Sequence, residues 1–124
     1  MKLSALLGLN GVLAFLFGLG FLILPGWMLA AYGAEPTPAL SQMARFYGSA
    51  MLGYGALTWL ARNVDDSPAR RAIARSLMVS FAVGLVVALW GQKTGVVNAL
   101  GWLTVALYLF FTLGYGYLQN PKKS

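Results

Sequence analysis

Arg45 is the residue whose type and position most clearly suggest a binding site. It is the only charged residue in the apolar run over residues 40–61. If this run forms a membrane-spanning helix, Arg45 lies about 9 Å from the bilayer centre. Ionisable residues at such depth are rare and often functional. The guanidinium could bind an anionic head group. Alternatively, the side chain could extend to the interface as an anchor, or pair with Glu35 or loop carbonyls.

Several uncharged polar side chains are expected at a depth close to that of Arg45. Together they could line a pocket beneath the outer interface that takes an anionic head group or the polar end of another ligand. The predicted ligand-binding residues are Arg45, Tyr47, Gln42, Gln92 and Asn98, with Lys93 beside them.

Three further polar residues are expected within the membrane. Asn10 lies about two turns into the first apolar run, and Tyr54 and Tyr108 lie near the middle of theirs. Each side chain needs a hydrogen-bond partner there. The tyrosine hydroxyls could bind a carbonyl of a quinone or pigment, or neighbouring helices could satisfy all three residues. Both interpretations remain open at this point.

The chain lacks most of the side chains on which enzymes and metal sites depend. It has no cysteine and no histidine, and its three acids, Glu35, Asp65 and Asp66, lie outside the apolar runs. Thiolate chemistry and imidazole ligation are therefore excluded, and no relay of acids crosses the membrane. No glycine-rich nucleotide motif occurs. We predict a protein that is not an enzyme and that has no cofactor and no metal.

The composition indicates a membrane protein. Of the 124 residues, 59% are hydrophobic and 10% are charged, whereas soluble domains carry about 25% charged residues. So few charges cannot coat a water-exposed surface. The net charge of +6 is better explained by residues that fix the orientation of the chain in the membrane than by binding of nucleic acid.

The apolar runs predict an all-α fold, a bundle of four transmembrane helices in a single domain over residues 1–124. The expected spans cover about residues 3–24, 40–61, 72–90 and 96–118. A short interfacial helix around Trp27 that stops at Gly33 is expected after the first span. Ser41 is expected to cap the second span, and Ser67 with Pro68 is expected to open the third.

A cleavable signal peptide is the competing interpretation of the first apolar run. Lys2 precedes this run, and Ala31-Tyr32-Gly33 could serve as a cleavage site. However, the run is longer than the usual hydrophobic region of about 7–15 residues. We therefore expect it to be retained as a span.

The distribution of basic residues predicts the orientation. An even number of spans places both termini on one side. That side holds seven basic residues, and the loops of the other side hold only Lys93. The seven are Lys2, Arg62, Arg70, Arg71, Arg75, Lys122 and Lys123. The positive-inside rule therefore predicts that both termini are cytoplasmic.

Small residues recur at the spacing of one helix face and predict helix packing. In lipid, close backbone approach and interhelical hydrogen bonds hold helices together, so small residues mark contacts. The predicted packing residues are Ser76, Ser80, Gly84 and Ala88 in the third span, and Gly48 and Gly53 in the second. The stripe in the third span extends back to Ala72. These stripes could pack within one chain, against a second copy, or against a partner protein.

Three segments carry a resemblance to known proteins. They are LILPGWMLAAYG, ARFYG and GVVNALGW, which begin at residues 22, 44 and 95. Over about residues 3–118 the chain resembles small bacterial four-helix membrane proteins of unknown function, with an overall shape similar to DoxX-like proteins. The resemblance implies a four-helix bundle in the inner membrane of a bacterium and no defined reaction. The layout is also similar to that of the eukaryotic scaffold proteins that tether sterol-synthesis enzymes.

These observations favour two functions of different kinds. The first is a non-enzymatic accessory or scaffold subunit, a homo-oligomer or part of a larger membrane complex. The alternative is a binder or carrier of a lipid, a quinone or a similar amphiphile, with its polar end near Arg45. A small channel or transporter ranks third, because four short spans can form a pore only as an oligomer. The lipid bilayer is an expected partner in every case.

Overall fold

The structure is a computed structural model that describes residues 2–118, and in this part of the chain the regular secondary structure is all helix, without a strand. Three of its helices, α1, α4 and α5, are long and apolar enough to cross a membrane. The predicted all-α class is therefore confirmed, and the helices are compatible with a multi-pass membrane protein. The five helices are α1 (Leu3–Ile23), α2 (Pro25–Ala31), α3 (Pro38–Ala61), α4 (Pro68–Thr94) and α5 (Gly101–Leu118).

Prolines at first helical positions determine where α2, α3 and α4 begin. Proline has no backbone N–H, and its fixed φ angle suits the first residue of a helix. The Ser67 hydroxyl accepts a hydrogen bond from the Arg70 backbone N–H at 3.2 Å, so the predicted start of α4 is confirmed. For α3 the predicted cap, Ser41, is wrong. The Thr37 hydroxyl accepts from the Leu40 N–H at 3.1 Å, because Pro38 starts the helix one turn earlier.

The connection between α4 and α5 differs most from the sequence prediction. Helix α4 continues to Thr94 and ends at Gly95, whose φ of +74° favours glycine. Helix α5 begins at Gly101 rather than near residue 96. The Asn98 side chain accepts a hydrogen bond from the Leu100 N–H at 3.0 Å, and the Gly101 N–H donates to the Asn98 carbonyl at 3.0 Å. These local bonds hold the segment in a tight turn before the helix starts.

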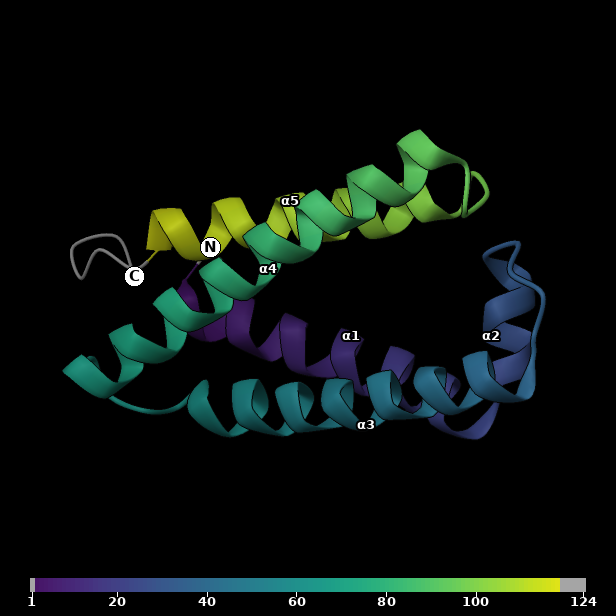
Figure 1. Ribbon diagram of the computed structural model, residues 1–124. Coiled ribbons are helices and arrows are strands. Elements are labelled where there is room, and N and C mark those ends of the chain that lie inside the picture. The colour runs from purple at the N-terminus through teal and green to yellow at the C-terminus, as the bar shows by residue number, and fades with distance from the viewer. Residues whose placement is uncertain (1, 119–124) are drawn as a thin grey trace.

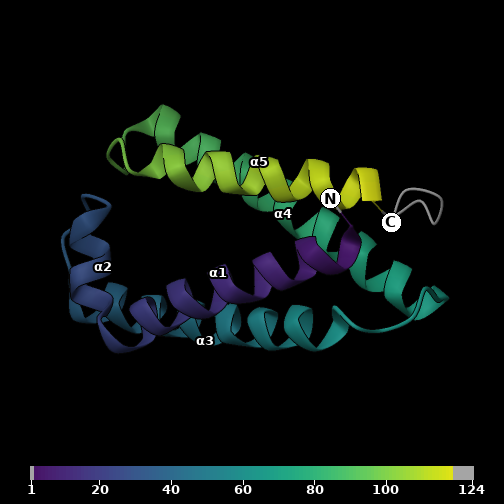
Figure 2. The ribbon, with the colours of Figure 1, turned by 180° about the vertical axis from the view of Figure 1, so that it is seen from behind.

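The long helices form two pairs, α1 with α3 and α4 with α5 (Figure 1). The pairs converge where α1 and α4 begin and where α3 and α5 end, and they diverge toward the other end. Figure 2 shows the same divergence from behind. The short helix α2 lies at the diverging end, after a break at Leu24, and is followed by Gly33 with a φ of +83°.

The converging end contains the core, and we call it the packed end. Aromatic rings stack across it, with Phe81 centred 4.9 Å from Phe111 and 6.1 Å from Tyr115. The Asn10 amide donates to the Tyr115 hydroxyl at 2.8 Å and joins α1 to α5. The buried core residues are Leu3, Leu6, Leu7, Ala61, Ala74, Leu77, Phe111, Tyr115 and Leu118.

Glycines allow α1 and α3 to approach closely along their length. A β-carbon on Gly48 would lie 2.7 Å from the Gly18 carbonyl oxygen, and one on Gly55 would lie 3.2 Å from the Gly11 carbonyl oxygen. Backbone therefore meets backbone at both positions, as in small-residue contacts between membrane helices. Helices α1 and α3 therefore form one closely packed wall of the diverging end.

Candidate functional site

An apolar cleft opens between the two helix pairs at the diverging end. It has two compartments, one of about 420 Å³ beside α2 and one of about 390 Å³ toward the packed end. We call them the α2 compartment and the inner compartment. They share five lining residues and therefore adjoin each other. The shared residues are Phe17, Tyr47, Met51, Leu107 and Tyr108.

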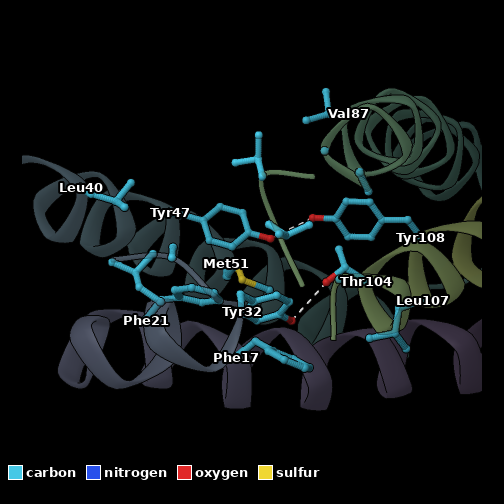
Figure 3. Close-up of a pocket in the computed structure, with 17 residues that line it drawn as sticks. Phe17, Phe21, Tyr32, Leu40, Tyr47, Met51, Val87, Thr104, Leu107 and Tyr108 are labelled. Atoms are coloured by element: carbon cyan, nitrogen blue, oxygen red, sulfur yellow. Dashed lines mark hydrogen bonds between the residues drawn. The ribbon is translucent and has the colours of Figure 1, made fainter. Parts of the chain in front are cut away.

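Two pairs of hydroxyl groups cross the cleft from one wall to the other. The Tyr47 and Tyr108 hydroxyls lie 2.8 Å apart and link α3 to α5. The Tyr32 hydroxyl, at the end of α2, lies 3.1 Å from the Thr104 hydroxyl on α5. Figure 3 shows both pairs pointing toward one another among apolar side chains. The cleft therefore offers hydrogen bonds at its centre and hydrophobic contacts around them.

Packing around the rings fixes the position of the two tyrosines. Phe21 meets Tyr47 edge-on, with ring centroids 5.1 Å apart, and Phe81 meets Tyr108 in the same way at 5.4 Å. Gly84 gives Tyr108 its space, because a β-carbon at this position would lie 2.5 Å from the Tyr108 ring. The glycine on α4 thus determines where the hydroxyl on α5 lies.

A second set of polar contacts joins the helix pairs beside the inner compartment. The Tyr54 hydroxyl on α3 lies 3.4 Å from the Ser80 hydroxyl on α4. Asn10, whose amide bonds Tyr115, also lines this compartment. Tyr54 and Tyr108, which the sequence analysis expects near the middle of their spans, each bond to a neighbouring helix. Tyr108 also faces an open space.

The cleft lining among the described residues contains no charged side chain. Its polar groups are hydroxyls and one amide, so it offers neither a counter-ion nor a general base of ordinary strength. A lining of this kind suits an apolar chain with a small uncharged polar group.

The structure separates the five residues predicted to bind a ligand. Tyr47 lines the cleft, whereas Arg45 and Gln42 are exposed on α3 and line neither compartment. The helix turns by about 100° per residue, so Arg45 projects about 200° away from Tyr47. Arg45 therefore faces the outside of the bundle, as an anchor would.

Asn98 and Gln92 hold the α4–α5 connection beside the cleft. The Asn98 amide donates to the Ala31 carbonyl at 3.0 Å, and its backbone N–H donates to the Tyr32 carbonyl at 3.0 Å. With its amide oriented to suit its neighbours, Gln92 accepts from the Trp102 indole N–H at 2.9 Å. Both residues therefore tie elements together at the mouth of the cleft and are not among its lining residues.

The predicted packing residues fall in different surroundings. Gly84 contacts Tyr108, Gly48 contacts α1, and Ala88 lines the α2 compartment. The Ser76 hydroxyl donates to the Ala72 carbonyl of its own helix at 2.8 Å, as hydroxyls in apolar helices often do. A β-carbon on Gly53 would meet no atom within 4 Å. One side of α4 therefore faces the cleft and α5, and Gly53 faces outward.

The spacing of the tyrosines is a further sequence signal for the cleft. Tyr47 and Tyr54 are seven residues apart on α3, and so are Tyr108 and Tyr115 on α5. Seven residues are close to two helical turns, so each pair occupies one face of its helix. Two such faces predict opposed rows of hydroxyls. Nothing in the sequence, however, indicated that Tyr32 would meet Thr104.

The fold and site together define a helical protein that has helices long and apolar enough to cross a membrane, with an uncharged, hydroxyl-bearing cleft between its helix pairs. Comparison with protein-family models, with curated proteins and with solved structures gave no match.

Proposed function

We propose that this chain is a four-span protein of the bacterial cytoplasmic membrane that binds a lipid, a quinone or a similar amphiphile in its cleft. The observation that carries the proposal is the uncharged cleft between the α1–α3 pair and the α4–α5 pair, with two pairs of hydroxyl groups at its centre. Ligand sites are typically apolar clefts of about 300–1,000 Å³ with a few placed polar groups. Both compartments fall within that range.

The fourth span in this proposal is α3. It has 24 residues and so extends for about 36 Å, which exceeds the roughly 30 Å hydrocarbon core. Its lower hydropathy comes from Gln42, Arg45 and other polar residues. Helix α3 packs along α1, which is itself apolar enough to cross a membrane. A helix held against a span over its whole length would cross with it.

The charges support a cytoplasmic location for the packed end. Lys2, Arg62 and Arg70 lie at helix ends there. The Arg62 guanidinium stacks over the Trp59 ring at 3.7 Å, which is typical of an interfacial anchor. Lys122 and Lys123, part of the predicted bias, lie outside the described residues.

A fluorescent protein fused to the C-terminus should fold and emit, and alkaline phosphatase fused there should be inactive. The opposite pair of results would overturn this orientation.

The cleft suits an amphiphile because its occupant would enter from the bilayer. Its lining is apolar, and Tyr47 is 40% exposed without a membrane present. In lipid that surface would face an acyl chain or a bound molecule. The polar end of the ligand would then lie near the tyrosine hydroxyls rather than near Arg45, which lines neither compartment.

Native mass spectrometry of the protein extracted with its own lipids tests this function. We expect the wild type to retain a small amphiphile. Met51→Trp should lose it, because Met51 lines both compartments and a larger ring would fill the space. Leu60→Trp is the matched control, since Leu60 is 74% exposed on the same helix and lines neither compartment. Equal retention by both variants, at equal melting temperature, would show that the cleft is not the site.

An accessory or scaffold subunit is the second candidate function. It is favoured by the outer face of α4, where Val79, Val86 and Trp90 are 57%, 67% and 64% exposed. Lipid covers such a face equally well, so this observation carries less weight. Photocrosslinking in living cells, from a photoreactive amino acid introduced in place of Val86, distinguishes a scaffold surface from a lipid-facing one. A scaffold would crosslink one partner protein or a second copy in fixed proportion, whereas a lipid-facing residue would crosslink lipids.

A further inference from the structure

We infer that the cleft selects an uncharged amphiphile whose head presents a carbonyl or hydroxyl oxygen, and that the Tyr47–Tyr108 pair is its receptor. The inference rests on the proposed function and names the class of ligand. It follows from two features of the cleft, the hydrogen-bonding capacity left in its hydroxyl pairs and the absence of charge around them.

The Tyr47–Tyr108 pair has a donor to spare. A phenol can donate one hydrogen bond and can also accept. At 2.8 Å one hydroxyl donates to the other, and the hydroxyl that accepts keeps its own O–H. No other hydrogen bond reaches either hydroxyl from residues 2–118. An unmatched donor in an apolar space is unfavourable, so an oxygen acceptor from a ligand would be stabilised there.

The Tyr32–Thr104 pair repeats this arrangement in the α2 compartment. Its two hydroxyls share one hydrogen bond at 3.1 Å, so one O–H is again not used within the pair. Phe21 touches both tyrosines, stacking on Tyr32 at 6.3 Å and meeting Tyr47 edge-on. One tyrosine of each pair therefore packs on Phe21, and Figure 3 shows both pairs in the same compartment.

The charges of the molecule argue against a charged head. Of the described residues that line the cleft, none is basic or acidic. Arg45 is exposed on another face of α3, and Lys93 lies near Trp90, with its ammonium 5.9 Å from that ring, and does not line the cleft. An anion or cation in this space would lose its hydration without gaining a partner, which is strongly unfavourable. A neutral oxygen loses far less.

Competition against a photoreactive long-chain alkanol in lipid nanodiscs tests the inference. The competitors share one alkyl chain and differ in the head: the alkanol, the methyl ketone, the phosphate monoester, the trimethylammonium and the plain alkane. Crosslinks should map to cleft residues such as Met51 and Leu107. We expect the alkanol and the ketone to compete at least about tenfold better than either ion or the alkane. The ratio of alkanol to ketone shows which neutral oxygen is preferred.

Hydroxyl deletions identify the receptor. Tyr47→Phe and Tyr108→Phe keep the rings and should each weaken alkanol binding by roughly two- to tenfold. Tyr117→Phe is the control, because Tyr117 is 61% exposed and lines neither compartment. The inference would be overturned if neutral and charged heads competed equally, or if neither tyrosine substitution changed the affinity for the alkanol. The cleft would then be a general amphiphile site. The absence of any cleft crosslink would instead refute the proposed function itself.

Discussion

The two ends of the bundle use tyrosine in different ways. At the packed end Tyr115 is fully buried, stacks on Phe81 and accepts a hydrogen bond from Asn10. Two turns earlier on the same helix, Tyr108 meets Tyr47 across an open cleft. The residue type and the helix face are the same in both cases. Whether the hydroxyl is structural or available to a ligand depends on what fills the space around it.

The spacing between the helix pairs explains the difference. At the packed end Leu6 and Leu77 fill the region between them, and both are almost completely buried. At the diverging end the α4 side of the cleft contains the small residues Gly84, Ala88 and Gly91. Asn98 also bonds the α4–α5 connection to the end of α2, so that α2 lies between the pairs as a spacer.

The largest effect on stability is expected from removing a buried aromatic ring at the packed end. Phe111→Ala removes a ring that is 3% exposed and stacks on two others. Such truncations cost about 3–5 kcal/mol. The neighbouring Phe110, 42% exposed, is the matched control, and Phe110→Ala should cost far less. Thermal unfolding in detergent measures both. Equal losses would mean that the packed end is not the core.

A smaller loss of stability is expected from a substitution that forces α1 and α3 apart. A β-carbon at Gly48 would lie 2.7 Å from the Gly18 carbonyl and 2.8 Å from the Leu22 nitrogen. Since the obstacle is backbone, Gly48→Ala should destabilise the protein by about 1–3 kcal/mol. Gly53→Ala meets open space on the same helix and should be neutral or stabilising. If both variants have the melting temperature of the wild type, α1 and α3 do not contact each other closely at Gly48.

A double-mutant cycle sharpens the contrast between the two tyrosines. Asn10→Ala and Tyr115→Phe should be coupled by about 0.6–1.7 kcal/mol in stability, which runs from the mean to the maximum for interhelical hydrogen bonds in membranes. Tyr47→Phe and Tyr108→Phe should show weaker coupling in stability and a shared loss of ligand affinity. A stronger stability coupling for the cleft pair than for the packed pair would reverse the roles assigned to the two ends.

The smallest effect is expected at Arg45. Because this side chain faces away from the cleft, Arg45→Lys and Arg45→Gln should leave the retained amphiphile unchanged. Stability should change by no more than about 0.5 kcal/mol for the lysine variant, which can also reach the interface. Loss of ligand in folded Arg45→Lys would return the polar end of the site to Arg45 and contradict the placement in the cleft.

The helices were predictable from the sequence because their signals are local. Apolar runs, Pro25, Gly33, and Ser67 with Pro68 mark helix limits through backbone chemistry that needs no tertiary information. The start of α5 was not predictable in this way. Val96 and Val97 continue the apolar pattern, but Gly95 ends α4 with a positive φ and the hydrogen bonds of Asn98 hold the following residues in a turn.

The cleft was less predictable because it depends on how two helix pairs diverge. The sequence identified Tyr47 and Tyr108 as polar residues within the membrane, but it grouped Tyr47 with Arg45 by depth. Depth along a helix does not specify the face, and Arg45 lies on another face of α3. The contact between Tyr32 and Thr104 joins positions 72 residues apart, which no local pattern indicates.

Photocrosslinking from within the cleft in living cells tests the central claim most directly. The benzophenone amino acid p-benzoylphenylalanine is introduced in place of Met51 in one strain and in place of Leu60 in another, and the adduct masses are measured. From position 51 we expect one small uncharged amphiphile, and from the exposed position 60 the bulk phospholipids of the membrane. The same phospholipid mixture from both positions would contradict a selective ligand site between the helix pairs.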